Sequence, residues 1–173
     1  MKLFTIGHSN MSTEEFVERL RANGIGVVVD VRSKPFSRYN PHFNRYVIAE
    51  DLQEAGIPYV WMGHSLGGVP DDPELLTKGR PDYEKIRASV PYQEALQELL
   101  RGVEVNAALG HVALVCGEGD PTGCHRRRLV GADLVKLGIE LVHVLKDGEQ
   151  ATEHTIREGL GENQPSVLDM FAG

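Results

Sequence analysis

The stretch Val27-Val28-Val29-Asp30-Val31-Arg32 decides the fold. Its apolar residues are all valine and do not alternate with polar ones, a pattern typical of a strand buried on both faces of a parallel sheet. The charged residues Asp30 and Arg32 follow where that strand is expected to end. A second apolar run, residues 112–115, leads in the same way into Cys116. Strands that end in reactive side chains are the usual way an α/β fold builds a site.

The rest of the chain alternates strand and helix patterns around these two runs. Ser12 followed by Glu15 has the spacing of a helix capping box, and Asn23-Gly24 ends that helix. We predict strands at 2–6, 27–31, 58–62, 112–116 and 139–145, with helices at about 12–22, 46–55, 91–100 and 124–137. This order predicts a three-layer α/β fold, a mostly parallel five-stranded sheet with helices on both faces. We expect a single domain at 1–148 and a loosely attached C-terminal tail at 149–173.

Composition restricts the class of protein. The chain has 173 residues, a net charge of −7 and no apolar run near the roughly 20 residues that a membrane span needs. We therefore expect a cytoplasmic protein that does not bind a membrane. Two cysteines form no disulfide framework and are expected to be free thiols.

Positive charge gathers in two segments although the chain as a whole is acidic. Residues 30–46 carry four basic side chains against Asp30 alone, and residues 124–128 add three arginines. A local basic cluster raises the concentration of an anionic ligand even on an acidic protein. The alternative is that these arginines pair with acidic neighbours.

The carboxyl ends of parallel strands meet at one edge of a sheet, so the polar segments that follow them should converge. We predict an anion-binding site at that edge. Its expected residues are His8, Ser9, Arg32, Ser37, Arg38, His125 and Arg126. The ligand is expected to be an anionic small molecule or one related to nucleic acid.

Two thiols and two carboxylates are the candidates for chemistry at the same edge. Cys116 ends a predicted strand, and Cys124 lies where a helix begins and where unpaired N–H groups stabilise a thiolate. Glu118, like Asp120, could act as acid or base, and Asp30 could orient Arg32, Arg38 or a bound hydroxyl. The alternative for Cys116 is that it packs as a small apolar residue.

The sequence does not predict a metal site. Cys116, Cys124 and His125 could be joined by His8 or His64, but no CxxC pair exists and adjacent Cys-His residues rarely both reach one ion. Neither a P-loop nor a GxGxxG fingerprint follows a predicted strand. We therefore expect no metal and no cofactor.

The motifs together resemble the domain of unknown function 488 family. They are Thr5-Ile6-Gly7-His8-Ser9, Asp30-Val31-Arg32-Ser33 with Pro35 and Ser37-Arg38, Leu66-Gly67-Gly68, and Cys116-x-Glu118 followed by Cys124-His125-Arg126. The resemblance covers residues 3–145. It implies an α/β fold and a role for these loops, and it supplies no substrate.

Two weaker likenesses leave the function open. Rhodanese-type domains also carry Asp-x-Arg after a strand and later a strand ending in Cys, which implies a sulfurtransferase or phosphatase that uses Cys116. The loop from Cys116 to Arg126 is longer than the thiol cradle of those domains. Residues 164–171 resemble the peptides with which DNA-maintenance proteins dock on sliding clamps, which implies a non-enzymatic adaptor. The sequence leaves open whether the chain is an enzyme or a binding module.

Overall fold

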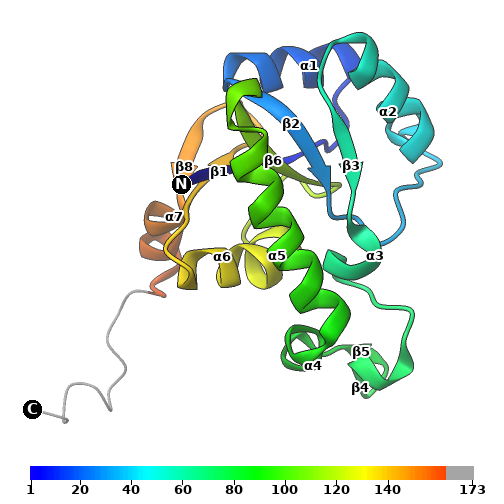
Figure 1. The fold of residues 1–173 in the computed structure, drawn as a ribbon, viewed down its shortest axis with the longest axis vertical. Coiled ribbons are helices and arrows are strands. Elements are labelled where there is room, and N and C mark those ends of the chain that lie inside the picture. The colour runs from blue at the N-terminus through cyan, green and yellow to red at the C-terminus, as the bar shows by residue number, and fades with distance from the viewer. Residues whose placement is uncertain (163–173) are drawn as a thin grey trace, which may run out of the picture.

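Five parallel strands form the centre of the structure, a computed structural model that describes residues 1–162 (Figure 1). The whole sheet has the order β3-β2-β6-β1-β7-β8. Because β6 lies between β2 and β1, the ends of these three strands are neighbours. The bounds of the parallel strands are β1 Lys2–Gly7, β2 Ile25–Asp30, β3 Tyr59–Trp61, β6 His111–Cys116 and β7 Glu140–Val144.

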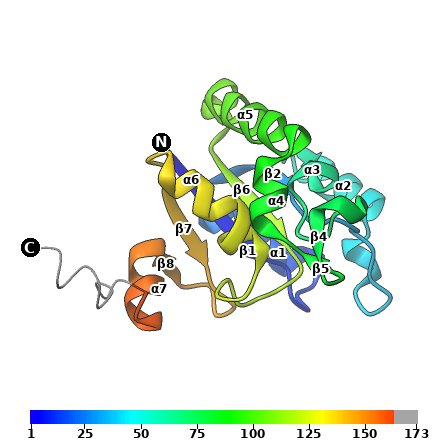
Figure 2. The same cartoon turned by 90° about the horizontal axis from the view of Figure 1, so that it is seen from below.

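Two pairs of helices cover the two faces of the sheet. Helices α1 (Thr13–Ala22) and α2 (Arg45–Glu54) pack on one face. Helices α5 (Val90–Val105) and α6 (Ala132–Lys136) pack on the other, with α5 running across the sheet in Figure 1 and beside α6 in Figure 2. The predicted three-layer, mostly parallel α/β fold is therefore confirmed.

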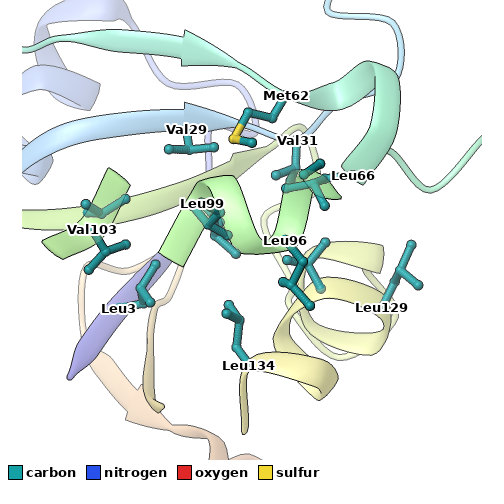
Figure 3. Packing of buried hydrophobic residues seen from close by; sticks show 14 of the residues in the cluster. Leu3, Val29, Val31, Met62, Leu66, Leu96, Leu99, Val103, Leu129 and Leu134 are labelled. Atoms are coloured by element: carbon teal, nitrogen blue, oxygen red, sulfur yellow. The ribbon is translucent and has the colours of Figure 1, made fainter. Parts of the chain in front are cut away.

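Consecutive residues of the central strands β1, β2 and β6 face opposite sides of the sheet. Leu3 packs in the cluster under α5, and Phe4 packs in the cluster under α1. Figure 3 shows the first cluster, in which Leu99 and Val103 of α5 lie over Val29 of β2. Full burial of one such side chain stabilises the fold by about 1.5–3 kcal/mol. Burial on both faces is why the valine run of β2 shows no alternation.

Shorter elements connect the main strands and helices, most of them on the site side of the sheet and Ala107–Leu109 at the opposite end, just before β6. They are α3 (Gly63–Leu66), the hairpin of β4 (Leu76–Thr77) and β5 (Arg80–Pro81), α4 (Tyr83–Ala88), the 3-10 helices Pro41–Phe43, Pro73–Leu75 and Ala107–Leu109, and the π-helical turn Arg126–Gly131. Within residues 1–162, none of the helices has both the length and the apolar character needed to cross a membrane.

The sheet has one more strand than the five predicted. Strand β8 (Gln150–Thr152) pairs antiparallel with β7, and helix α7 (Glu153–Leu160) follows it. Residues 150–160 therefore belong to the folded domain and not to a loose tail that starts at 149. A three-residue strand with a single apolar residue, Ala151, is too short to show a hydrophobic pattern, so only its pairing with β7 reveals it. The clamp-like segment 164–171 lies outside the described residues.

A buried ion-pair network ties α7 to the sheet. The Glu153 carboxylate accepts hydrogen bonds from Arg127 Nε at 2.9 Å, His143 Nε2 at 3.0 Å and Arg157 Nε at 2.8 Å. Burial alone would raise the pKa of Glu153, but these hydrogen bonds outweigh it and lower the pKa to about 2. The charged carboxylate is therefore part of the native packing.

We expect Glu153→Gln to destabilise the fold at pH 7 by about 2 kcal/mol, because two buried or half-buried cations lose their partner. The native pKa of Glu153 lies below its ordinary value of 4.5, so its contribution is complete above that pH and is lost toward pH 2. Thermal unfolding between pH 2 and pH 7 should therefore show a smaller loss of stability in acid for the variant than for the wild type. Glu158→Gln, on the exposed side of α7, is the matched control and should follow the wild-type curve. Parallel curves for Glu153→Gln and the wild type would contradict the assignment.

Candidate functional site

The ends of β1, β2 and β6 are hydrogen-bonded to one another beyond the regular sheet. His8 N donates to Cys116 O at 2.9 Å, and Ser9 N donates to Gly117 O at 2.9 Å. On the other side of β6, Val31 N donates to the Val115 carbonyl at 3.1 Å. The backbone thus holds His8, the Asp30-Val31-Arg32 segment and Cys116 side by side, as the sequence predicts for this edge.

A cavity of about 620 Å³ opens at this edge of the sheet. Five separate segments of the chain line it, from the ends of β1, β2 and β6, from the loop after α3 and from the start of α4. Its lining residues are His8, Ser9, Arg32, Ser33, Lys34, Phe36, Ser37, Asn40, Gly68, Val69, Tyr83, Cys116, Gly117, Glu118, Gly123, Cys124 and His125.

A buried ion pair lies beneath the cavity. Arg32 Nη2 donates to Asp30 Oδ2 at 2.6 Å, and Arg32 Nε donates to both carboxylate oxygens at 2.9 and 3.0 Å. The Arg32 backbone N–H and the Tyr59 hydroxyl complete the ring of donors around Asp30, at 2.9 and 2.6 Å. Asp30 is 0% exposed. Both carboxylate oxygens of Asp30 already accept hydrogen bonds from the protein, mainly from Arg32. The role of Asp30 in the structure is therefore to orient Arg32.

Arg32 uses nearly all of its five N–H groups inside the protein. Besides the bonds to Asp30, Nη2 donates to the Phe43 carbonyl at 2.9 Å and Nη1 donates to His8 Nε2 at 3.0 Å. One Nη1 hydrogen has no acceptor within the described residues, and Arg32 lines the cavity. Arg32 can therefore give a ligand one directed hydrogen bond, while its charge is balanced by Asp30.

His8 is held as a neutral ring. Its Nδ1 carries the proton, because it donates to the Ser9 carbonyl at 3.0 Å, which leaves Nε2 to accept from Arg32. The ring stacks on Phe43 with centroids 4.1 Å apart. Burial, reinforced by the nearby Arg32 charge, lowers the pKa of His8 to about 4. His8 therefore acts at neutral pH as a fixed acceptor for Arg32.

The two cysteines meet at the imidazole of His125. Nδ1 of His125 lies 3.7 Å from Cys116 Sγ and 3.9 Å from Cys124 Sγ. The other ring nitrogen, Nε2, donates to the Val31 carbonyl at 2.8 Å. Within the described residues, these three side chains are the group whose ligand atoms all lie within 4.8 Å of one another, so they could hold a metal ion. Cys124 and His125, although adjacent in the chain, both present a ligand atom near Cys116 Sγ.

The buried thiols have opposite protonation tendencies. A hydrogen bond from the Cys124 thiol, followed by His125 and by the backbone N–H of Glu118, lowers the pKa of Cys116. The same hydrogen bond and burial raise the pKa of Cys124. Burial alone would lower the pKa of His125, but the neighbouring Cys116 raises it. These opposite shifts favour a thiolate at Cys116 over one at Cys124.

Two glycines allow segments of the backbone to approach one another closely at the site. A Cβ on Gly68 would lie 2.6 Å from the His125 Cβ, so the loop after α3 packs directly on the base of the imidazole. A Cβ on Gly7 would overlap the Glu118 carbonyl, which lies beside the end of β1. The Gly67-Gly68 and Gly7-His8 motifs are therefore needed for close approach of the backbone.

Arg126 supports the site from behind and does not line it. Its side chain is 0% exposed, and its guanidinium donates to the Glu118 carbonyl and, at 3.0 Å, to the Gly119 carbonyl. Its Nε also approaches the Thr5 hydroxyl at 3.4 Å. Arg126 thus fixes the loop after β6 and has no surface left for a ligand, in contrast to the anion contact predicted from the sequence.

Most of the predicted site residues come together, and three have other positions. His8, Ser9, Arg32, Ser37, Cys116, Glu118, Cys124 and His125 line the cavity, whereas Asp30 lies beneath it, Arg126 behind it, and the exposed Arg38 is not part of its lining. Sequence reasoning missed Lys34, Asn40 and Tyr83 as lining residues and Tyr59 as a partner of Asp30. Lys34 and Asn40 lie within the basic segment that was singled out. Tyr83 and Tyr59 carried no signal, because their roles depend on packing.

The ion pair beneath the cavity can be tested by a graded pair of variants. Asp30→Asn should destabilise the fold by about 3–5 kcal/mol, since it leaves the buried Arg32 charge without its partner. Tyr59→Phe removes a single hydrogen bond to the same carboxylate and should cost only about 1 kcal/mol. Urea unfolding of both variants measures the difference. Equal and small losses would show that Asp30 does not hold Arg32 in the native protein.

Comparison with known proteins identifies the family. The family model described as "Domain of unknown function DUF488" matches residues 12–132, which is most of the chain. The matched stretch contains Asp30, Arg32, Cys116, Cys124 and His125. No curated protein and no solved structure gives a match. The chain therefore belongs to the family of the domain of unknown function DUF488.

Proposed function

We propose that the cavity binds an organic anion, such as a phosphate ester or a nucleotide, and that the protein acts on it at the Cys116–Cys124–His125 cluster. The observation that carries this proposal is the convergence of five segments on one cavity whose floor holds two thiols and an imidazole. Perturbed titratable groups in the wall of a cavity are characteristic of functional sites.

Directed donors support an anionic group near the floor. Arg32 offers its remaining Nη1 hydrogen, and Lys34 adds an ammonium group whose one ion pair within residues 1–162 is with the exposed Asp71 at 3.4 Å. Such an exposed pair is weak, so a ligand can replace it at little cost. The Ser37 hydroxyl oxygen already accepts from Asn40 N, which leaves its proton for a ligand.

The rim of the cavity has a different character and supports an organic group on the anion. Phe36 and Val69 line the cavity and are exposed, at 69% and 59% of their surface. An aromatic ring beside a basic loop can stack on a base or another flat ring. The combination of a polar floor and an apolar rim favours a nucleotide-like ligand over a free inorganic ion.

Sulfur or phosphoryl transfer through Cys116 is the second candidate. Cys116 ends a central strand, and the Glu118 N–H is directed at its sulfur, which resembles the start of an anion cradle. The thiolate would attack the sulfur or phosphorus of the donor and expel the anion that carried it. Against this candidate, the segment from Cys116 to Arg126 is longer than the thiol cradle of rhodanese-type domains, and Arg126 holds its Glu118 and Gly119 carbonyls.

The anion site can be tested with inorganic phosphate and AMP as probes. Both should shift the amide NMR signals of residues that line the cavity, and AMP should bind more tightly because its base contacts the rim. We expect Lys34→Ala to weaken both probes about tenfold, the effect of losing one charge-assisted contact. Phe36→Ala should weaken AMP and leave phosphate unchanged.

Arg38→Ala is the matched control for Lys34→Ala, since Arg38 is basic and lies in the same loop but outside the cavity lining. Its effect should be much smaller. Equal losses for the two variants, or signal changes confined to residues outside the cavity, would contradict an anion site at this place. Bound AMP should also slow the alkylation of Cys116 by iodoacetamide, which links the ligand to the thiols without assuming a reaction.

A further inference from the structure

The positions of Cys116, Cys124 and His125 match the ligand set of a tetrahedral metal ion. Zn²⁺ binds sulfur at about 2.3 Å and nitrogen at about 2.0–2.1 Å, so tetrahedral geometry puts each sulfur about 3.6 Å from the nitrogen. The observed distances from His125 Nδ1 are 3.7 Å to Cys116 Sγ and 3.9 Å to Cys124 Sγ. Both distances lie within a few tenths of an ångström of that value, and the three ligand atoms all lie within 4.8 Å of one another.

The surroundings orient these atoms as the second layer of a metal site does. His125 Nε2 donates to the Val31 carbonyl, which directs Nδ1 toward the two sulfurs. Metal-binding histidines almost always give their other N–H to a carbonyl or carboxylate in this way. Each sulfur also has a backbone N–H nearby, from Glu118 for Cys116 and from Arg126 for Cys124. A buried pair of thiolates is stabilised by such donors.

The fourth position faces the cavity. All three side chains line the cavity, although the cysteines themselves are only 6% and 3% exposed. His8 does not supply the fourth ligand, because Ser9 O and Arg32 Nη1 engage both of its ring nitrogens. His64, the other histidine considered from the sequence, is not among the lining residues. Three protein ligands with an open fourth position are typical of catalytic zinc sites, whereas structural sites are closed by four.

We propose that Cys116, Cys124 and His125 bind one thiophilic divalent cation of the zinc type, with its open position directed into the cavity. The choice of metal follows from the ligands, because two thiolates and an imidazole favour Zn²⁺ over Mg²⁺ or Ca²⁺. Two thiolates balance the charge of the ion. The inference rests on the proposed function only in that the bound anion would take the open position; binding of the metal itself needs no anion.

The site can be tested on the full chain after reduction and removal of metal with a chelator. Titration with Co²⁺, a spectroscopic substitute for Zn²⁺, should give one equivalent per chain with a sulfur-to-cobalt charge-transfer band and intense visible d–d bands typical of four coordination. Added Zn²⁺ should abolish these bands and protect both cysteines from iodoacetamide. Saturation without a charge-transfer band would overturn the proposal.

Ligand variants locate the ion. Cys116→Ser, Cys124→Ser and His125→Ala should each weaken Co²⁺ binding at least a hundredfold. His111→Ala is the matched control, because His111 is an exposed histidine at the opposite end of strand β6, and it should bind Co²⁺ as the wild type does. Circular dichroism of each variant shows whether it is folded. Unchanged affinity in any folded ligand variant would exclude that residue and with it the site as proposed.

A second pair of variants tests the geometry and leaves the three ligands in place. Gly68→Ala puts a methyl group 2.6 Å from the His125 Cβ and should weaken Co²⁺ binding by moving the imidazole. Gly102→Ala, in helix α5 where the added Cβ has no neighbour within 4 Å, should leave binding unchanged. Equal affinities in these two variants would show that the placement of His125 does not matter to the ion, against the proposal.

The same protein separates failure of this inference from failure of the proposed function. AMP binding is measured before and after addition of Zn²⁺. If AMP binds and Co²⁺ does not, the metal site is wrong and the anion site stands. If Co²⁺ binds with the expected spectrum and AMP does not bind in either state, the metal site stands and the proposed ligand is wrong.

Discussion

The buried ion pair of Asp30 and Arg32 is the interaction on which the candidate site depends. A fully buried carboxylate is tolerated only when its oxygens are hydrogen-bonded, and Asp30 meets this requirement through Arg32 and Tyr59. In turn, Arg32 reaches His8 and the Phe43 carbonyl. One pair of charges thus connects the ends of β1 and β2 and the first residue of β3 with the loop before α2. The cavity lies above these connected segments.

Three arginines at or near the site have different roles. Arg126 is completely buried and holds the loop after β6 by its carbonyls, and Arg127 anchors α7 through Glu153. Arg32 alone of the three lines the cavity, with a single N–H free of protein acceptors in the described part of the chain. Clustered positive charge in the sequence therefore serves mainly to satisfy buried carbonyls and carboxylates, and less to bind an anion directly.

The family match covers most of the candidate site. The model of the domain of unknown function DUF488 covers residues 12–132, and this range includes both cysteines, His125 and the Asp30–Arg32 pair. His8 and Ser9 precede it, as β1 does, although β1 is a central strand of the sheet. The cysteine and histidine cluster, with the ion pair beneath it, is thus contained in the matched range, while one wall of the cavity comes from outside it.

The sequence by itself determined the fold class and the edge at which the site lies. Valine runs without alternation indicate strands buried on both faces, and polar residues after such strands must meet where parallel strands end. It did not reveal β8, whose three residues, Gln150-Ala151-Thr152, form a strand only because they pair with the edge of β7. Nor could it show that Cys124 and His125, adjacent in the chain, both reach Cys116. The helical turn that begins near Cys124 sets the directions of these two side chains, and Gly68 lets the loop after α3 pack against His125. Which arginine is buried and which faces the cavity was likewise decided by tertiary packing, because the same side chain serves either purpose and only its neighbours select between them.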